Sequence, residues 1–125
     1  MRNKEAVIIN NDKESLGGLE EILAATGYDS VVVHDAFSAV DIVVQRKPDV
    51  ILVELKMPRK NGFEIAEEIN RVLETEKIPI IAMSKFFKDE FGFLLNLCGI
   101  NRHLKKPFNA LNVIWAIENL PEKGN

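Results

Sequence analysis

The chain has 125 residues, of which 46% are hydrophobic and 28% charged, and its formal net charge is −3. This composition is typical of one globular domain and excludes a disordered chain, while the mild acidity argues against a dedicated nucleic-acid binder. One cysteine and two histidines exclude a disulfide framework and a cysteine/histidine metal cluster, and no apolar run is long enough to cross a membrane. We therefore expect one cytoplasmic domain over residues 1–125, with a loose tail from about residue 121 and no separate output domain.

Short apolar runs alternate along the chain with segments of helical periodicity. The runs predict buried strands over residues 6–9, 31–33, 50–53, 78–83 and 103–105. Apolar residues at helical spacing predict helices over residues 16–26, 36–47, 63–73, 91–98 and 110–120. Gly27 and Gly99 are placed to end the first and fourth helices, and Asn109 is placed to cap the last one.

Strict alternation of strands and helices predicts a parallel sheet with helices on both faces. The functional site of such a sheet lies beyond the carboxyl ends of its strands. The segments to examine are therefore the ones that follow each strand, at residues 10–12, 54–62, 84–85 and 105–108.

Three of these segments resemble the receiver domain of two-component response regulators. Residues 48–62, Pro-Asp-Val-Ile-Leu-Val-Glu-Leu-Lys-Met-Pro-Arg-Lys-Asn-Gly, are similar to the pattern around the phospho-accepting aspartate. Residues 78–84 are similar to the strand that delivers a Ser/Thr, and residues 104–108, Leu-Lys-Lys-Pro-Phe, to the strand that delivers a lysine before Pro-Phe. The resemblance covers residues 5–120 and implies a flavodoxin-like, doubly wound α/β fold, with a five-stranded parallel sheet in the order 2-1-3-4-5 and five helices.

The resemblance also implies roles for individual residues. Glu54 stands at the phospho-acceptor position, Asn11 and Asp12 at the acidic pair, and Ser84 and Lys106 at the positions that contact the phosphoryl group. In the family, the acidic residues hold Mg²⁺, which neutralises charge on the phosphoryl oxygens, and the lysine is a point charge on the same group. The bond before Pro107 resembles the family's cis peptide, although the sequence does not show its isomer.

The sequence departs from the family where the metal would bind. The acceptor is Glu54 and not aspartate, and one member of the acidic pair is Asn11; sliding the alignment by one residue makes the pair Asn10 and Asn11. The metal ligands would be Asp12, Glu54 and Lys56, and the loss of a carboxylate predicts weak Mg²⁺ binding or none. We therefore expect no cofactor.

Glu54 has three interpretations. Its extra methylene extends the carboxylate towards Lys106 and Ser84, where it would partially imitate a phosphoryl group with about one charge instead of nearly two. It could instead be a structural acid that pairs with Lys106, or it could accept phosphate slowly. Because Glu54 is displaced relative to an in-line donor, we expect negligible phosphotransfer.

Two more positions differ from the family's usual residues. The position after Ser84 usually holds a small residue and here holds Lys85, which is either a solvated loop lysine or a salt-bridge partner of Glu54 or Asp12. The position of the family's switch aromatic holds His103, which is either a partly exposed histidine at a strand edge or a pH-sensitive switch. The loops at this edge of the sheet hold more cations than anions, so they could attract an anion more readily than Mg²⁺.

The family's usual partner face consists of the fourth helix, the fifth strand and the last helix. We expect Phe91 and Phe93 to lie mainly in the core. Contact anchors are predicted at Phe86, Phe87, Leu111 and Trp115. The expected partner is a protein, either a histidine kinase or a downstream signalling protein, with a homodimer as a further option and no nucleic acid or membrane.

The leading hypothesis is a stand-alone, atypical receiver, not an enzyme, which signals by protein contact without a phosphorylation cycle. The first alternative is a working receiver that takes phosphate from a histidine kinase in the presence of Mg²⁺. The remote alternative is a flavin-binding flavodoxin relative, which the segment Asn10-Asn11-Asp12-Lys13 disfavours because it lacks a hydroxyl-rich phosphate loop.

Overall fold

The computed structural model describes residues 3–11, 16–74, 77–85 and 91–121. Its five strands are β1 (Lys4–Ile9), β2 (Tyr28–Val33), β3 (Val50–Glu54), β4 (Ile80–Ser84) and β5 (Arg102–Lys105). Its five helices are α1 (Leu19–Ala25), α2 (Ala36–Arg46), α3 (Gly62–Val72), α4 (Phe91–Leu97) and α5 (Ala110–Glu118). The predicted alternation of strands and helices is confirmed along the described chain.

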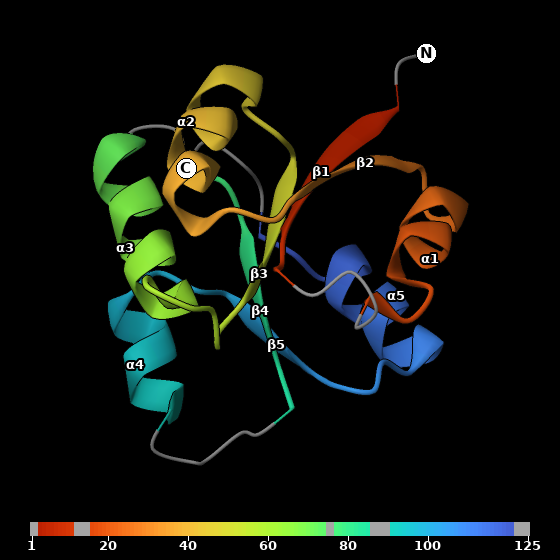
Figure 1. Ribbon diagram of the computed structural model, residues 1–125. Coiled ribbons are helices and arrows are strands. Elements are labelled where there is room, and N and C mark those ends of the chain that lie inside the picture. The colour runs from red at the N-terminus through yellow and green to blue at the C-terminus, as the bar shows by residue number, and fades with distance from the viewer. Residues whose placement is uncertain (1–2, 12–15, 75–76, 86–90, 122–125) are drawn as a thin grey trace.

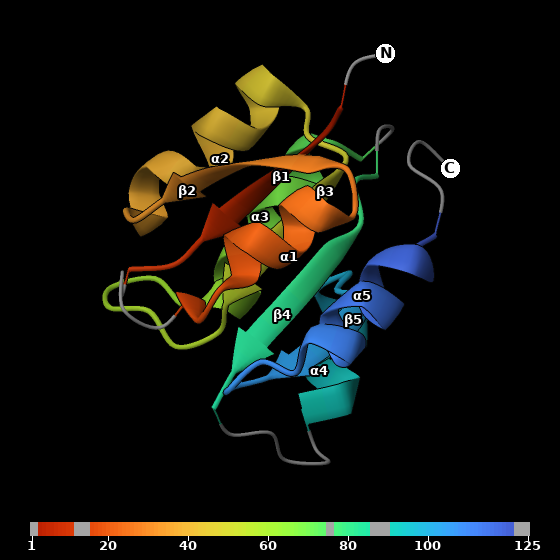
Figure 2. The same ribbon diagram turned by 90° about the vertical axis from the view of Figure 1, so that its right-hand side faces the viewer.

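All four strand pairs are parallel, and the sheet order is β2-β1-β3-β4-β5. Helices α2, α3 and α4 cover one face of the sheet, and α1 and α5 cover the other (Figure 1). Figure 2 views the molecule from the side of α1 and α5. The flavodoxin-like fold class and strand order are therefore confirmed.

The central strands are buried on both faces, which explains their uninterrupted apolar sequences. Side chains of β1 and β3 alternate between the two core layers: Val7 and Ile51 pack under α2 and α3, whereas Ile8 and Leu52 pack under α1 and α5. This arrangement fixes the register, because a slip by one residue would exchange the two layers. The carboxyl ends of the strands consequently have one defined arrangement.

Two element boundaries differ from the sequence-based prediction. Helix α1 begins at Leu19 and not near residue 16, because Gly17 and Gly18 adopt positive φ angles of 52° and 81° and cannot belong to a right-handed helix. Strand β4 begins at Ile80, because Pro79 has no N–H to donate; its carbonyl still accepts a hydrogen bond from Ile51 N at 2.9 Å. Among the described residues, no helix has the length and apolar character that a membrane span requires.

Candidate functional site

The candidate site lies where the parallel strands end. Glu54 and Ser84 are the last residues of β3 and β4, and Lys106 follows β5 directly. These three side chains line one cleft of about 990 Å³, which we name the Glu54 cleft. Its lining comes from the residues that end or follow β1, β3, β4 and β5 and from the starts of α3 and α4: Asn11, Glu54, Leu55, Lys56, Met57, Asn61, Phe63, Ser84, Lys85, Phe91 and Lys106. The structure thus brings together residues that are up to 95 positions apart in the sequence.

A buried ion pair occupies the centre of the cleft. Lys106 Nζ donates to Glu54 Oε1 at 2.5 Å, and the two side chains are only 4% and 12% exposed. Such a short, charge-assisted contact between buried groups is much less screened by solvent than a surface ion pair. The second carboxylate oxygen, Glu54 Oε2, is buried and accepts no hydrogen bond from the described residues.

Backbone hydrogen bonds hold the loops that carry this pair. Leu55 N donates to Met83 O at 2.9 Å, and Lys106 N donates to Ser84 O at 2.9 Å. The Lys106–Pro107 peptide is cis. The loop after Glu54 therefore stays hydrogen-bonded to β4, and the backbone of Lys106 stays bonded to the end of the same strand.

The loop after β3 returns tightly to the start of α3. Gly62 N donates to Leu55 O at 2.9 Å, and a Cβ atom at Gly62 would lie 2.5 Å from the backbone oxygen of Glu54. Only glycine allows this approach. Asn61 caps α3 with a capping box: its side chain accepts from Glu64 N at 2.9 Å, and Glu64 Oε1 accepts from Asn61 N at 3.2 Å.

Positive charge exceeds negative charge in the Glu54 cleft. Among its described lining residues, Glu54 is the one carboxylate, while Lys56, Lys85 and Lys106 are cations, so three positive charges minus one negative leave a net charge of +2. Lys56 and Lys85 are exposed, and the described residues contain no ion pair between Lys85 and Glu54. A cleft with this balance favours an anion over a divalent cation.

The end of β1 contributes amides to this region. Asn10 is fully buried and its N–H donates to Val33 O at 2.9 Å, whereas Asn11 is exposed and lines the cleft. Asp12 lies outside the described residues. His34, which no sequence motif marks, donates from Nδ1 to Asn10 O at 2.7 Å and so ties the end of β2 to this loop.

The described residues do not by themselves fit a Mg²⁺ site. No group of three His, Cys, Asp or Glu side chains among them could hold a metal ion. The carboxylate that faces the cleft, Glu54, already has one oxygen on an ammonium group. Mg²⁺ prefers hard oxygen ligands in octahedral geometry, and the one described carboxylate of the cleft is already paired with Lys106.

His103 lies on β5, opposite Ala82 in the strand register, and is half-buried. Burial lowers the pKa of His103 below its ordinary value. The imidazole therefore favours the neutral form in the folded protein.

The predicted partner face is rich in exposed apolar side chains. On α5, Leu111 is 75% exposed and Trp115 57%, and the Arg102 guanidinium lies 5.6 Å from the Trp115 ring centroid. On α4, Phe91 is half-buried and packs edge-to-face on Phe63 with ring centroids 5.9 Å apart. Phe93, by contrast, is 69% exposed, so the prediction that it lies in the core is wrong; it projects from the opposite side of a short helix.

Phe86 and Phe87 lie outside the described residues. The exposed apolar residues that the structure adds to this face on α4 are Phe93, Leu94 and Leu97.

A comparison with protein families identifies the chain. Residues 6–118 match the model of the response regulator receiver domain. The chain belongs to this family. Receiver domains are signalling domains of two-component systems that interact with kinases and effector domains.

Solved structures of receiver proteins share the fold. The chemotaxis protein CheY4 of Vibrio cholerae superposes with a TM-score of 0.86 at 18% identity, over 95% of this chain and 99% of that one. The Francisella response regulator 1452 receiver domain gives 0.81 at 21% identity, over 93% and 94% of the two chains. A two-component response regulator from Clostridium difficile gives 0.79 at 23% identity, over 92% of each chain. At these identities the likeness shows the fold alone.

Proposed function

We propose that this receiver domain is atypical and signals through protein contacts without a phosphorylation cycle, with Glu54 as a partial substitute for a phosphorylated acceptor. The observation that carries the proposal is the buried ion pair between Lys106 Nζ and Glu54 Oε1 at 2.5 Å. On this proposal, the lysine that would contact a phosphoryl group already has an anionic partner.

The chemistry of the pair supports imitation that is only partial. A glutamate supplies about one negative charge and two oxygens, whereas a phosphoryl group supplies nearly two charges and three oxygens. One of the two carboxylate oxygens is bound by Lys106, and the other accepts no hydrogen bond from the described chain. We propose that the domain consequently rests between the unphosphorylated and the phosphorylated condition of an ordinary receiver.

Weak metal binding is the second part of the proposal. Ile9 pairs with Val53, so the next position on β1 is Asn10 and the next position on β3 is Glu54. Because Asn10 is thus beside the acceptor position, this register favours Asn10 and Asn11 as the equivalents of the acidic pair. With amides there and a net charge of +2 on the described lining residues, the Mg²⁺ that phosphotransfer needs would bind weakly or not at all.

Intact mass after incubation with acetyl phosphate and Mg²⁺ tests the first part. We expect the wild-type protein to gain no phosphoryl group, and we expect Glu54→Asp, which restores the family's acceptor, to gain at most a fraction of one. A stoichiometric adduct on the wild type that disappears in Glu54→Gln would overturn the proposal in favour of a working phospho-accepting receiver.

Trp115, the one tryptophan of the chain, tests whether Glu54 influences the partner face. Glu54→Gln keeps the shape of the side chain and removes its charge, so we expect it to shift the indole N–H resonance of Trp115. Glu67→Gln, at an exposed carboxylate of α3 outside the capping box and the cleft, is the matched control and should leave the resonance unchanged. An unchanged resonance in Glu54→Gln would show that the carboxylate is not coupled to this face.

A further inference from the structure

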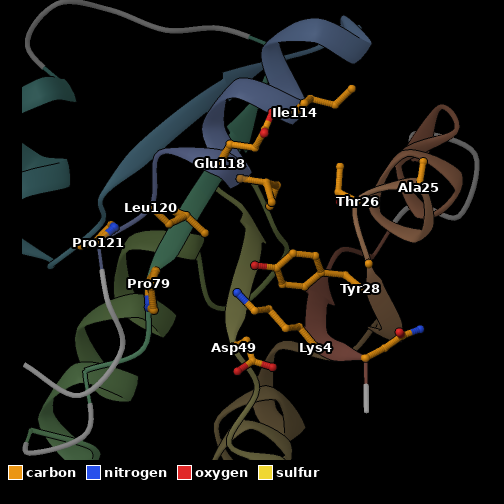
Figure 3. Close-up of a pocket in the computed structure, with 13 residues that line it drawn as sticks. Lys4, Ala25, Thr26, Tyr28, Asp49, Pro79, Ile114, Glu118, Leu120 and Pro121 are labelled. Carbon is orange, nitrogen blue, oxygen red and sulfur yellow. The ribbon is translucent and has the colours of Figure 1, made fainter. Parts of the chain in front are cut away.

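A second cleft lies at the opposite edge of the sheet, where the strands begin. It has a volume of about 970 Å³ and is lined by the starts of β1 to β4, the end of α1 and the end of α5 (Figure 3). We name it the Tyr28 cleft. A volume of this order is sufficient for a small organic ligand.

Tyr28 provides the first indication that the cleft is a binding site. Tyr28 as a whole is only 6% exposed, and its hydroxyl has no hydrogen-bond partner among the described residues. Figure 3 shows the ring extending into the middle of the cleft with the hydroxyl at its tip. This hydroxyl is accessible from the cleft, so it is available to bond to a ligand that enters. Burial and the nearby Asp49 raise the pKa of Tyr28, which keeps the phenol protonated as both donor and acceptor.

Charges of both signs line the same cleft. The Lys4 ammonium lies 5.9 Å from the Tyr28 ring centroid and has no ion pair among the described residues. Asp49 accepts from Glu5 N at 2.8 Å through Oδ2, which leaves Oδ1 without a partner in the described part of the chain. Glu118 on α5 is exposed and also has no ion pair there. The cleft therefore offers one ammonium, two carboxylates and one phenol.

The remaining wall is apolar. Pro79, Ile114, Ile117 and Leu120 line the side between β4 and α5. A ligand that used the whole cleft would place an apolar group on this wall and its polar groups beside Tyr28.

The charges select the class of ligand. An anion alone would face two carboxylates, and a cation alone would leave Lys4 without a counter-charge. A zwitterion matches both signs. We propose that the Tyr28 cleft binds a small zwitterion with an apolar side chain, of the kind represented by a free hydrophobic amino acid. Its carboxylate would accept from Lys4 and Tyr28, its ammonium would donate to Asp49 or Glu118, and its side chain would pack on Ile117 and Leu120.

L-Phenylalanine is the probe, and ¹H–¹⁵N correlation spectra of the whole chain are the measurement. We expect saturable shifts at the amides of Lys4, Tyr28 and Asp49, with a dissociation constant on the order of 1 mM for a ligand of this size. Three comparators each lack one part of the ligand: 2-phenylethylamine lacks the carboxylate, 3-phenylpropanoate lacks the ammonium and glycine lacks the apolar group. Each should bind at least about threefold more weakly.

Two variants and one control locate the site. Tyr28→Phe removes one hydrogen bond and should weaken binding roughly three- to tenfold. Because the hydroxyl has no partner in the described part of the folded chain, this variant should keep its stability. Lys4→Gln, at an exposed residue, should also weaken phenylalanine binding and should reduce its preference over 2-phenylethylamine. Glu67→Gln, at an exposed residue of α3 that lines neither cleft, should leave it unchanged.

Several results would overturn this inference. The first is the absence of saturable shifts at a phenylalanine concentration of about ten times the expected dissociation constant. The second and third are equal binding of the comparators and unchanged binding by Tyr28→Phe. The fourth is shifts that depend on protein concentration and not on phenylalanine concentration, which would indicate contact between two copies. The inference does not depend on the proposed function, because the two clefts are tested by different residues and different readouts.

Discussion

Replacement of Lys106 by methionine tests whether the ion pair with Glu54 is a buried interaction of the fold. Methionine approximates the length of the lysine side chain and removes its charge, which leaves the Glu54 carboxylate in a cleft where its side chain is only 12% exposed. At 2.5 Å, the Coulomb attraction is about 7 kcal/mol for an effective dielectric constant of about 20. Desolvation of the two ions offsets most of this attraction, so the net contribution of the intact pair is small.

The loss of one partner has a different consequence, because the other charge then stays buried without compensation. We expect Lys106→Met to lower the free energy of unfolding by about 3–5 kcal/mol. We expect the double variant Glu54→Gln/Lys106→Met to recover most of this loss, since it buries no charge. The measurement is urea unfolding followed by far-UV circular dichroism, for both single variants and the double variant.

Lys85→Met is the matched control, because Lys85 lines the same cleft but is exposed. Its effect should stay within about 0.5 kcal/mol. The reasoning would be refuted if Lys106→Met cost less than about 1 kcal/mol and showed no coupling to Glu54→Gln, because the pair would then behave like a solvated surface ion pair.

Three further predictions concern the surroundings of the site. Gly62→Ala should lower the free energy of unfolding by about 2 kcal/mol or more, because its Cβ would lie 2.5 Å from Glu54 O; Gly92→Ala, which meets nothing within 4 Å, should be neutral or stabilising in the same urea assay. Asn61→Ala should cost about 1 kcal/mol in thermal or urea unfolding through loss of the α3 capping box, and a loss below about 0.3 kcal/mol would contradict that role. Because the pKa of His103 is lower in the folded than in the unfolded protein, the unfolded state takes up the proton first, and the free energy of unfolding should fall as the pH drops below about 6.5. His103→Gln should reduce this loss of stability between pH 7.5 and pH 5.5. An unchanged loss would exclude His103 as its source.

The sheet could be predicted from the sequence because its central strands are buried on both faces. Residues 50–53 form an uninterrupted apolar run, and the structure places them in the middle of the sheet with neighbours on both edges. Helix boundaries were less predictable. The apolar period extends back to Leu16, but the positive φ angles of Gly17 and Gly18 make the helix begin only at Leu19. A periodic pattern predicts which side chains are buried, but it does not predict the φ angle of each residue.

The exposed face of α4 illustrates a second limit. Phe91 and Phe93 differ by two positions, and on a helix such residues point in different directions. Hydrophobicity alone predicted both in the core, whereas the structure buries part of Phe91 against Phe63 and exposes Phe93. A long helix defines its inward-facing apolar stripe clearly, whereas α4 has only seven residues and therefore few positions from which the stripe can be read.

The two clefts differ in how much of each the sequence revealed. Glu54, Ser84 and Lys106 each follow or end an apolar strand, so the rule for parallel sheets is sufficient to place them at one edge. Lys4, Tyr28, Asp49 and Glu118 have no common motif or spacing, and they meet because α1 and α5 end beside the starts of the strands. The direction of the Tyr28 side chain and its lack of a partner in the described chain depend on the three-dimensional packing, which no local pattern encodes.

The position of Lys106 connects the charge of the Glu54 cleft with the proposed absence of phosphotransfer. A phosphoryl donor that approaches Glu54 must compete with Lys106 for the carboxylate oxygen at 2.5 Å, and breaking this contact would cost both groups a buried charge-assisted hydrogen bond. A divalent cation faces the same competition and the additional repulsion of Lys56 and Lys85. On the proposed function, the pair that substitutes for a phosphorylated acceptor would also oppose phosphorylation, so a single substitution at Glu54 should alter both properties together.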